Sequence, residues 1–275
     1  MNDHRSAFDR CAELIRSADS LVIGAGAGIG VDSGLPDFRG EHGFWKAYPA
    51  LGRERISFYD IASPQSFERA PRLAWGFYGH RLALYRATVP HEGFAILRAI
   101  AAGLPHGAFV FTSNVDGQFQ KAGFAADRVD ECHGSIHHMQ CLDACMPEIW
   151  PADEFEPDID EGECRLRSEL PRCPTCDGLA RPNVLMFGDW NWAKRRELQQ
   201  GRALAAWRQK VGNPVVIELG AGTDIPSVRS FCERQRSPLI RINPREPDLG
   251  GLRGVSLSMG ALQAMQGIRD ALAVQ

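Results

Sequence analysis

The stretch SLVIGAGAGIG at residues 20–30 decides the fold of this chain. Its apolar half predicts a short buried strand, and its glycines predict a tight turn directly after that strand. Glycine lets the backbone approach a phosphate, and the N-terminus of a following helix favours negative charge. The spacing is not the strict G-x-G-x-x-G, because Ile29 takes the place of the third glycine. A phosphate-binding loop and a plain strand-to-helix turn both fit this spacing. The following residues, SGLPDFRG, add an acid, an aromatic ring and an arginine to a proline-stiffened loop and favour the binding loop.

Three more strands are predicted, by GAFVFTSNVD at 107–116, NPVVIELGAGTD at 213–224 and SPLIRINP at 237–244. Amphipathic stretches at 91–103, 193–212 and 259–274 predict helices between and after them. This alternation predicts an α/β fold with a parallel sheet covered on both faces, with ligands bound at the carboxyl ends of the strands.

Two segments interrupt the alternation of strands and helices. Residues 38–90 contain no convincing strand, and residues 137–182 hold five of the eight cysteines and an acidic run. A chain of 275 residues is long enough for a large and a small domain. We predict a sheet domain from 1–40, 91–136 and 183–275, and a small domain from a helical insertion at 41–90 and a metal-binding insertion at 137–182.

Composition limits the possible classes of protein. The chain is 44% hydrophobic and 24% charged, which is typical of a globular protein, and a net charge of −3 gives no indication of nucleic-acid binding. No apolar run approaches the roughly 20 residues of a membrane span, and the N-terminus lacks the apolar core of a signal peptide. We therefore expect a cytoplasmic protein with no membrane partner, in which cysteines serve better as metal ligands or buried thiols than as disulfides.

The cysteines form two close pairs, Cys141 with Cys145 and Cys173 with Cys176. Four thiolates in two pairs predict a tetrahedral zinc site, which is structural because no coordination position stays open. The first pair is one residue wider than the usual spacing, and Cys164 lies in the gap and could replace a ligand. Free thiols and a redox C-x-x-C are the alternatives.

Polar groups at the strand ends predict an active site. Asn114 and Asp116 could bind a carboxamide, although Asp116 could equally cap the next helix. In DECHGSIHH, His133 lies beside Gly134 in a predicted loop at the mouth of the sheet and is a candidate general base. We interpret His137 and His138 as structural.

The stretch AWGFYGHRLALYR at 74–86 raises a different question. If it is helical, Ala74, Tyr78, Arg81 and Tyr85 share one face of an otherwise apolar helix. A pocket for an anion would explain that face. A solvent-exposed Arg81 beside a core-packed Tyr78 is the alternative.

The motifs occur in one order: the glycine loop with PDFRG, then TSNVD, CHG, the two cysteine pairs, RPNVLMFGD, GAGTD and INP. Over roughly residues 21–264 this order resembles the sirtuin family, the NAD-dependent protein-lysine deacylases. The resemblance implies a Rossmann-like parallel-sheet domain with a smaller inserted helical and zinc-binding domain. It also implies that NAD and an acylated lysine of a protein are the partners.

The resemblance carries over to individual residues. His133 would be the general base, with Asn114 also catalytic, and the segment NVLMFGD would pair with the substrate peptide as an added strand through Val184, Leu185, Phe187 and Gly188. The implied NAD-binding residues are Gly24, Ala25, Gly26, Gly28, Asp37, Phe38, Arg39, Ser113, Asn114, Asp116, Gly220, Ala221, Gly222, Thr223 and Asn243. In the implied reaction the acyl oxygen attacks the ribose carbon as nicotinamide leaves, and the acyl group ends on ADP-ribose.

In one sirtuin subclass a Tyr-x-x-Arg contacts the acidic end of a succinyl, malonyl or glutaryl group, and Tyr78 and Arg81 match this motif. The resemblance thus favours the anion pocket and implies removal of acidic acyl groups, with acetyl also possible. Protein ADP-ribosyl transfer or NAD hydrolysis at the same site is the first alternative, and a non-enzymatic NAD or ADP-ribose sensor is the second.

The chain also departs from the family pattern. It has Gly30 where the family usually has Ser, Ser113 where it has Gln, GAG at 220–222 where it has GTS, and FGD where it has FGE. Each lost hydroxyl removes a possible hydrogen bond worth ~0.5–1.5 kcal/mol. Weaker NAD binding or slower turnover is therefore expected, rather than a different reaction.

Overall fold

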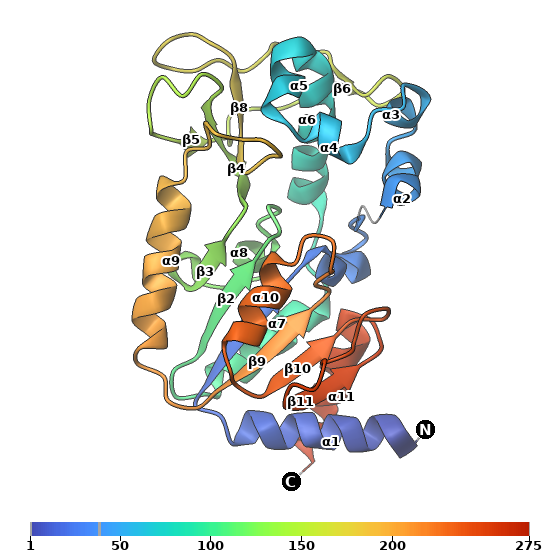
Figure 1. Cartoon of the computed structure of the whole chain (residues 1–275), viewed down its shortest axis with the longest axis vertical. Coiled ribbons are helices and arrows are strands. Elements are labelled where there is room, and N and C mark those ends of the chain that lie inside the picture. Colours follow the sequence, from blue (N-terminus) through green and yellow to red (C-terminus); the bar gives the residue numbers. More distant parts are fainter. Residues whose placement is uncertain (1, 38–39, 275) are drawn as a thin grey trace.

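A six-stranded parallel sheet forms the centre of the computed structural model, which describes residues 2–37 and 40–274 (Figure 1). The strand order is β11-β10-β9-β1-β2-β3. The strands are β1 (Ser20–Ala25), β2 (Ala108–Thr112), β3 (Val129–Glu131), β9 (Pro214–Leu219), β10 (Leu239–Ile242) and β11 (Gly254–Leu257). The order reverses between β1 and β9, and such a switch point opens a crevice at the carboxyl ends of a doubly wound sheet. The predicted α/β fold with a parallel sheet is confirmed.

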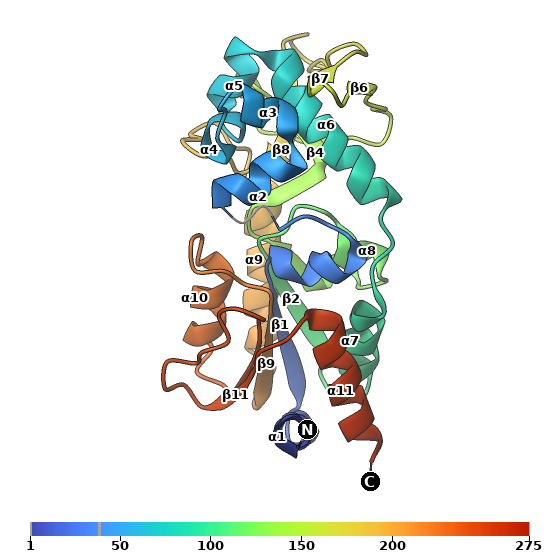
Figure 2. The same cartoon turned by 90° about the vertical axis from the view of Figure 1, so that its right-hand side faces the viewer.

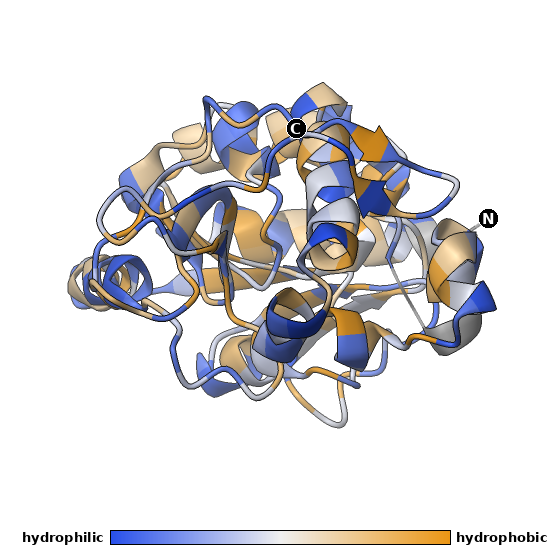
Figure 3. Cartoon of the chain, turned by 90° about the horizontal axis from the view of Figure 1, so that it is seen from above, coloured by the Kyte–Doolittle hydropathy of each residue, from blue (hydrophilic) through white to orange (hydrophobic). Residues whose placement is uncertain are grey.

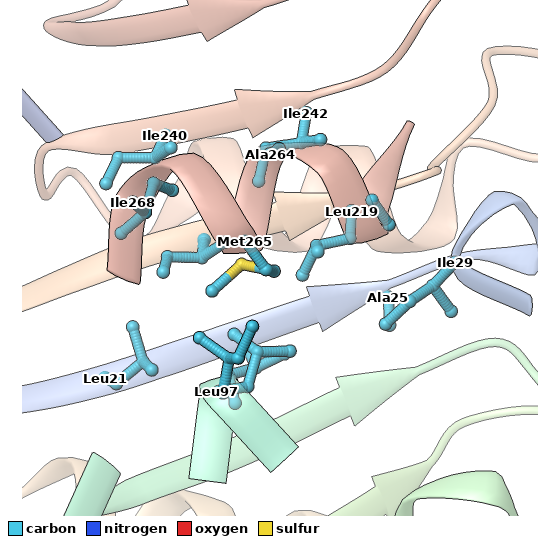
Figure 4. Close-up of a cluster of buried hydrophobic side chains, with 14 of the residues drawn as sticks. Leu21, Ala25, Ile29, Leu97, Leu219, Ile240, Ile242, Ala264, Met265 and Ile268 are labelled. Atoms are coloured by element: carbon cyan, nitrogen blue, oxygen red, sulfur yellow. The ribbon is translucent and has the colours of Figure 1, made fainter. Parts of the chain in front are cut away.

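Side chains of β1 alternate between the two faces of the sheet, as a strand requires. Leu21, Ile23 and Ala25 pack on one face beneath α1 (Asn2–Arg16), α7 (Glu92–Ala102) and α11 (Ala261–Ala273). Figure 4 shows Met265 and Ile268 of α11 directed toward the strands. Val22 packs on the opposite face with α9 (Arg195–Arg208) and α10 (Ser227–Arg234), so that helices cover both faces (Figure 2).

The two predicted insertions share a second hydrophobic core, which includes Phe44, Phe67, Phe77 and Trp75 on one side and Leu166 on the other. The helices are α2 (Gly40–Ala47), α3 (Pro49–Arg53), α4 (Phe58–Ile61), α5 (Pro64–Arg69) and α6 (Pro71–Ala87). The strands are β4 (Gly134–Cys141), β5 (Trp150–Pro151), β6 (Ile159–Asp160), β7 (Arg165–Leu166) and β8 (Ala180–Val184). These elements lie above the parallel sheet in Figure 1. The predicted domain boundaries stay a prediction.

Three short helical elements complete the chain: η1 (Ala27–Ser33), α8 (Gln118–Lys121) and η2 (Ala126–Arg128). Seen from above, hydrophilic and hydrophobic residues are mixed along the helices (Figure 3), as expected for helices with one solvated and one packed face. Within residues 2–37 and 40–274, no helix combines the length and apolarity needed to cross a bilayer.

Candidate active site

A cavity of about 860 Å³ lies at the carboxyl ends of β1, β2 and β9, between the parallel sheet and the helices α4 and α6. Most of the residues singled out from the sequence line it. They are Gly26, Asp37, Tyr78, Arg81, Ser113, Asn114, Asp116, His133, Val184, Leu185, Phe187, Gly188, Gly220, Ala221, Gly222 and Thr223. Residues from six separate stretches of the chain thus meet in one place.

Four of the predicted cofactor-binding residues, all described, do not line this cavity: Gly24, Ala25, Gly28 and Asn243. A Cβ on Gly24 would lie 2.1 Å from the Cys232 sulfur, so this glycine admits the close packing of α10. Asn243 is buried and its Nδ2 donates to the Ala221 carbonyl at 2.9 Å, which fixes the loop after β9. Their contribution to cofactor binding stays a prediction, and Phe38 and Arg39 lie outside the described residues.

The glycines of the loops after β1 and β9 let the two loops touch. Gly220 has a φ of +59°, and a Cβ there would lie 2.4 Å from the backbone of Gly28. The Gly28 N–H donates to the Gly220 carbonyl at 3.1 Å, which joins the loops directly. Gly26 and Gly220 also line the cavity, so the backbone itself forms part of the cavity wall. The glycine loop can therefore be both a tight turn and a ligand-binding loop.

Asn114 and Asp116 follow β2, and both line the cavity. Asn114 Nδ2 donates to the Gly26 carbonyl at 3.1 Å, which ties this strand end to the glycine loop. Asp116 Oδ1 accepts from the Gln118 N–H at 3.0 Å, so Asp116 bonds the first turn of α8 although Gly117 is the N-cap. Burial raises the pKa of Asp116 to about 6. Asp116 can therefore change its charge close to neutral pH.

His133 lies in the loop between β3 and β4, half-buried at the cavity wall. Burial lowers the pKa of its imidazole, and a hydrogen bond with the backbone of Ser113 opposes that shift. Its Nε2 lies 3.3 Å from Ser227 Oγ, a partner that the sequence did not indicate. A mostly neutral imidazole at neutral pH can accept a proton, which is the property a general base needs.

The segment after β8 forms another wall. The Leu185 N–H donates to the His133 carbonyl at 2.9 Å, and the Phe187 N–H donates to the Ala62 carbonyl at 2.9 Å. Beneath it, Arg181 Nη2 donates to Asp189 Oδ1 at 2.7 Å, with both side chains fully buried. This segment is therefore held by the general-base candidate, by the helical insertion and by a buried ion pair.

Tyr78 and Arg81 on α6 are buried, at 1% and 8% exposure, and both line the cavity. The solvent-exposed alternative for Arg81 is wrong. Its guanidinium lies over three aromatic rings, with its carbon 5.2 Å from the centroid of Phe77, 5.8 Å from that of Tyr78 and 5.4 Å from that of Tyr85. Arginine stays charged under these conditions, so the cavity contains a fixed cation in largely apolar surroundings.

Several lining residues were not predicted as site residues, among them Tyr59 from α4, Met186 and Tyr85. The signal for Tyr85 was present, because it lies four residues after Arg81 on the same helical face. Tyr59 gave no such signal, since only the packing of α4 against the segment after β8 brings it to the cavity, where its ring lies 4.1 Å from that of Phe187.

The four predicted zinc ligands cluster as expected. The sulfurs of Cys141, Cys145, Cys173 and Cys176 all lie within 4.8 Å of one another. Cys141 and Cys176 are 3.7 Å apart and Cys145 and Cys173 are 3.5 Å apart. A tetrahedral ion with Zn–S bonds of about 2.3 Å needs sulfurs about 3.8 Å apart. The cluster thus fits zinc, and Cys164 lies outside it, packed in the second hydrophobic core.

The class of protein is an α/β protein in which a doubly wound parallel sheet with a cavity at its switch point is joined to a four-cysteine module. The model of the Sir2 family matches residues 26–203. The chain belongs to the Sir2 family.

Two relatives illustrate the similarity. An NAD-dependent protein deacylase of Methylococcus capsulatus is 29% identical over 269 residues, or 96% of both chains. The mitochondrial NAD-dependent protein deacylase sirtuin-5 of Danio rerio is 33% identical over 192 residues, which cover 64% of this chain and 59% of that relative.

Solved structures show the same fold. A Sir2 homologue in complex with NAD matches with a TM-score of 0.72 and 24% identity, covering 95% of this chain and 92% of the other. A mutant Sir2 homologue in complex with ADP-ribose matches with a TM-score of 0.70 and 23% identity, covering 96% and 98%.

Proposed function

We propose that this protein removes acyl groups from protein lysines in an NAD-dependent reaction, with a preference for acyl groups that end in a carboxylate, such as succinyl and malonyl. The products would be nicotinamide, O-acyl-ADP-ribose and the free lysine. One observation carries the proposal: Arg81 and Tyr78 are buried in the same cavity as His133 and Asn114. Membership of the Sir2 family, with relatives that include a sirtuin-5 deacylase, supports the reaction class.

The acyl preference follows from the cost of burying charge. A carboxylate in an apolar cavity is strongly disfavoured unless a cation and hydrogen-bond donors meet it. Arg81 supplies a guanidinium whose planar fork matches a carboxylate, and the Tyr78 hydroxyl lies one helical turn away on the same face. An uncharged acetyl group offers the guanidinium and the phenol no charged acceptor. Acidic acyl chains should therefore bind better than acetyl.

When bound, NAD would supply an electrophilic ribose carbon and nicotinamide as the leaving group, since an amide oxygen is a weak nucleophile. Asn114 and Asp116 would hold the nicotinamide carboxamide, and Gly26 and the turn at 220–222 would approach the phosphates. His133 would take a proton from a ribose hydroxyl through its neutral imidazole. Binding the reactants together in one cavity orients them for reaction.

The protein substrate would enter along the segment after β8. Val184, Leu185, Phe187 and Gly188 line the cavity, and an extended peptide could pair with this segment as an added strand. Cys141 ends β4, Cys145 follows that strand, and Cys173 and Cys176 precede β8, so a zinc ion bound by all four would hold these two paired strands together.

The proposal is tested by incubating the protein with NAD and a succinyl-lysyl peptide and following all products by mass spectrometry. We expect loss of succinyl from the peptide, together with equal amounts of nicotinamide and O-succinyl-ADP-ribose. His133→Ala should remain folded and form O-succinyl-ADP-ribose and free lysine at least about 100-fold more slowly.

The same experiment separates the alternatives. ADP-ribose attached to the protein or peptide, without loss of succinyl, would instead favour ADP-ribosyl transfer. Nicotinamide released at the same rate without peptide would favour NAD hydrolysis, and NAD binding without any nicotinamide release would favour a sensor.

A further inference from the structure

Tyr85 holds the guanidinium of Arg81 in place. It lies one helical turn after Arg81 on α6, is 5% exposed and lines the cavity. Arg81 Nε donates to Tyr85 Oη at 2.9 Å, and Arg81 Nη2 donates to the same oxygen at 2.7 Å. Two charge-assisted hydrogen bonds to one phenol fix both the position and the plane of the guanidinium.

These two hydrogen bonds leave the proton of the Tyr85 hydroxyl available for donation. A phenol oxygen offers one proton besides the lone pairs with which it accepts, and both hydrogen bonds from Arg81 use acceptor capacity. Among the hydrogen bonds of the described residues, neither the Tyr85 hydroxyl nor the Tyr78 hydroxyl is a donor. Buried hydroxyls normally donate to a partner. Both residues line the cavity, so an acceptor in the cavity would satisfy them.

We propose that Tyr85 is a specificity-determining residue, which positions Arg81 and donates its own hydroxyl proton to the carboxylate at the end of the acyl chain. The proposal rests on the proposed function, and it assigns a third side chain to the Tyr-x-x-Arg pocket. The acyl carboxylate would then meet donors from Tyr78, Arg81 and Tyr85, all on one face of α6. An acyl group without a carboxylate offers these donors no charged acceptor.

A purely structural role for Tyr85 makes a different prediction. Its ring packs in the second hydrophobic core and stacks below Arg81, and Phe can replace both contacts. Tyr85→Phe therefore removes only the hydroxyl. Tyr48 offers a matched control, because its buried hydroxyl bonds His80 Nδ1 at 2.9 Å and it does not line the cavity.

The experiment measures kcat and KM of wild type, Tyr85→Phe, Tyr48→Phe and Arg81→Met with succinyl-lysyl and acetyl-lysyl peptides at saturating NAD. Loss of a hydrogen bond to a charged group should raise the KM of Tyr85→Phe for the succinyl peptide roughly 10- to 100-fold. Its kcat/KM for the acetyl peptide should stay within about twofold of wild type, and Tyr48→Phe should keep the wild-type preference for succinyl. Thermal unfolding of each variant confirms that it is folded.

The outcomes separate the two proposals. If Arg81→Met loses the succinyl preference but Tyr85→Phe keeps it, the role of Tyr85 is overturned and the acidic pocket stands. If Tyr85→Phe loses both activities equally, the residue is structural and the proposal is again overturned. If wild type shows no preference for succinyl, the acyl preference under the proposed function fails, and the role of Tyr85 fails with it.

Discussion

The buried ion pair between Arg181 and Asp189 should be essential for the cavity wall after β8, along which we propose that the substrate peptide binds. Both side chains are fully buried, and Asp189 Oδ1 accepts from Arg181 Nη2 at 2.7 Å. The same carboxylate accepts from the N–H of Asn191 at 3.2 Å and from the N–H of Met186 at 3.4 Å. Asp189→Asn retains the shape of the side chain but removes its charge.

The magnitude follows from the environment of the arginine that remains. Removing one partner of a buried pair leaves an uncompensated charge, which costs about 3–5 kcal/mol of unfolding free energy. Arg181 already has one buried nitrogen, Nε, without a partner in the described residues, so it has little means of compensation. We expect Asp189→Asn to lose about 3 kcal/mol or more. The KM for the acyl peptide should rise as well, because Met186 loses its contact with the charged carboxylate.

Urea denaturation monitored by circular dichroism measures the free energy of unfolding. Glu163→Gln is the matched control, because its partner Arg53 lies 3.4 Å away and both side chains are about 60% exposed. Exposed pairs contribute about 0–1 kcal/mol, so this control should change little. Asp189→Glu keeps the charge and should recover part of the loss. Equal effects of Asp189→Asn and Glu163→Gln would refute the argument from burial.

Other predictions concern the base, the metal and a buried acid. His133→Ala should lower the deacylation rate by about 100-fold or more, as loss of a general base does, and a single-turnover assay at saturating NAD measures this; a rate within threefold of wild type would remove His133 from that role. Cys173→Ser should reduce bound zinc, measured by elemental analysis, and lower the melting temperature, whereas a protein purified without zinc at full stability would contradict a structural metal. Burial raises the pKa of Asp130 from 3.8 to about 7, so between these pH values the folded protein binds more protons than the unfolded chain, and this contribution to stability falls as pH rises. Asp130→Asn should therefore make the free energy of unfolding decline less steeply from pH 4 to 7 in urea titrations; an unchanged slope would contradict the raised pKa.

The sequence predicts the sheet where its strands are apolar. β1, β2, β9 and β10 each contain an apolar run before a polar or glycine-rich end, and all four form as predicted. β3 was missed because two of its three residues, Asp130 and Glu131, are acidic. Glu131 is buried nonetheless, because Arg196 on α9 bonds its carboxylate across a long separation in sequence. The local sequence around β3 therefore gives no indication that Glu131 is paired and buried.

For the site too, local sequence predicts some features, and others depend on contacts with distant parts of the chain. The polar residues at strand ends meet because parallel strands end at one edge of the sheet, so Asn114 and His133 could be predicted to lie together. The shared face of Tyr78, Arg81 and Tyr85 follows from helical spacing alone. The direction of that face could not be predicted, since it depends on how α6 packs against the rest of the small core. The bonds from Arg81 to Tyr85 depend on side-chain geometry that spacing does not specify.

The acyl preference of wild type and Arg81→Met tests the central claim most directly. We would measure kcat/KM with NAD for succinyl-lysyl and acetyl-lysyl peptides of one sequence. The account predicts that wild type prefers succinyl and that Arg81→Met loses about 100-fold on succinyl while acetyl changes little, because the buried carboxylate loses its cation. Equal losses on both peptides, or no loss on either, would contradict a pocket built around Arg81.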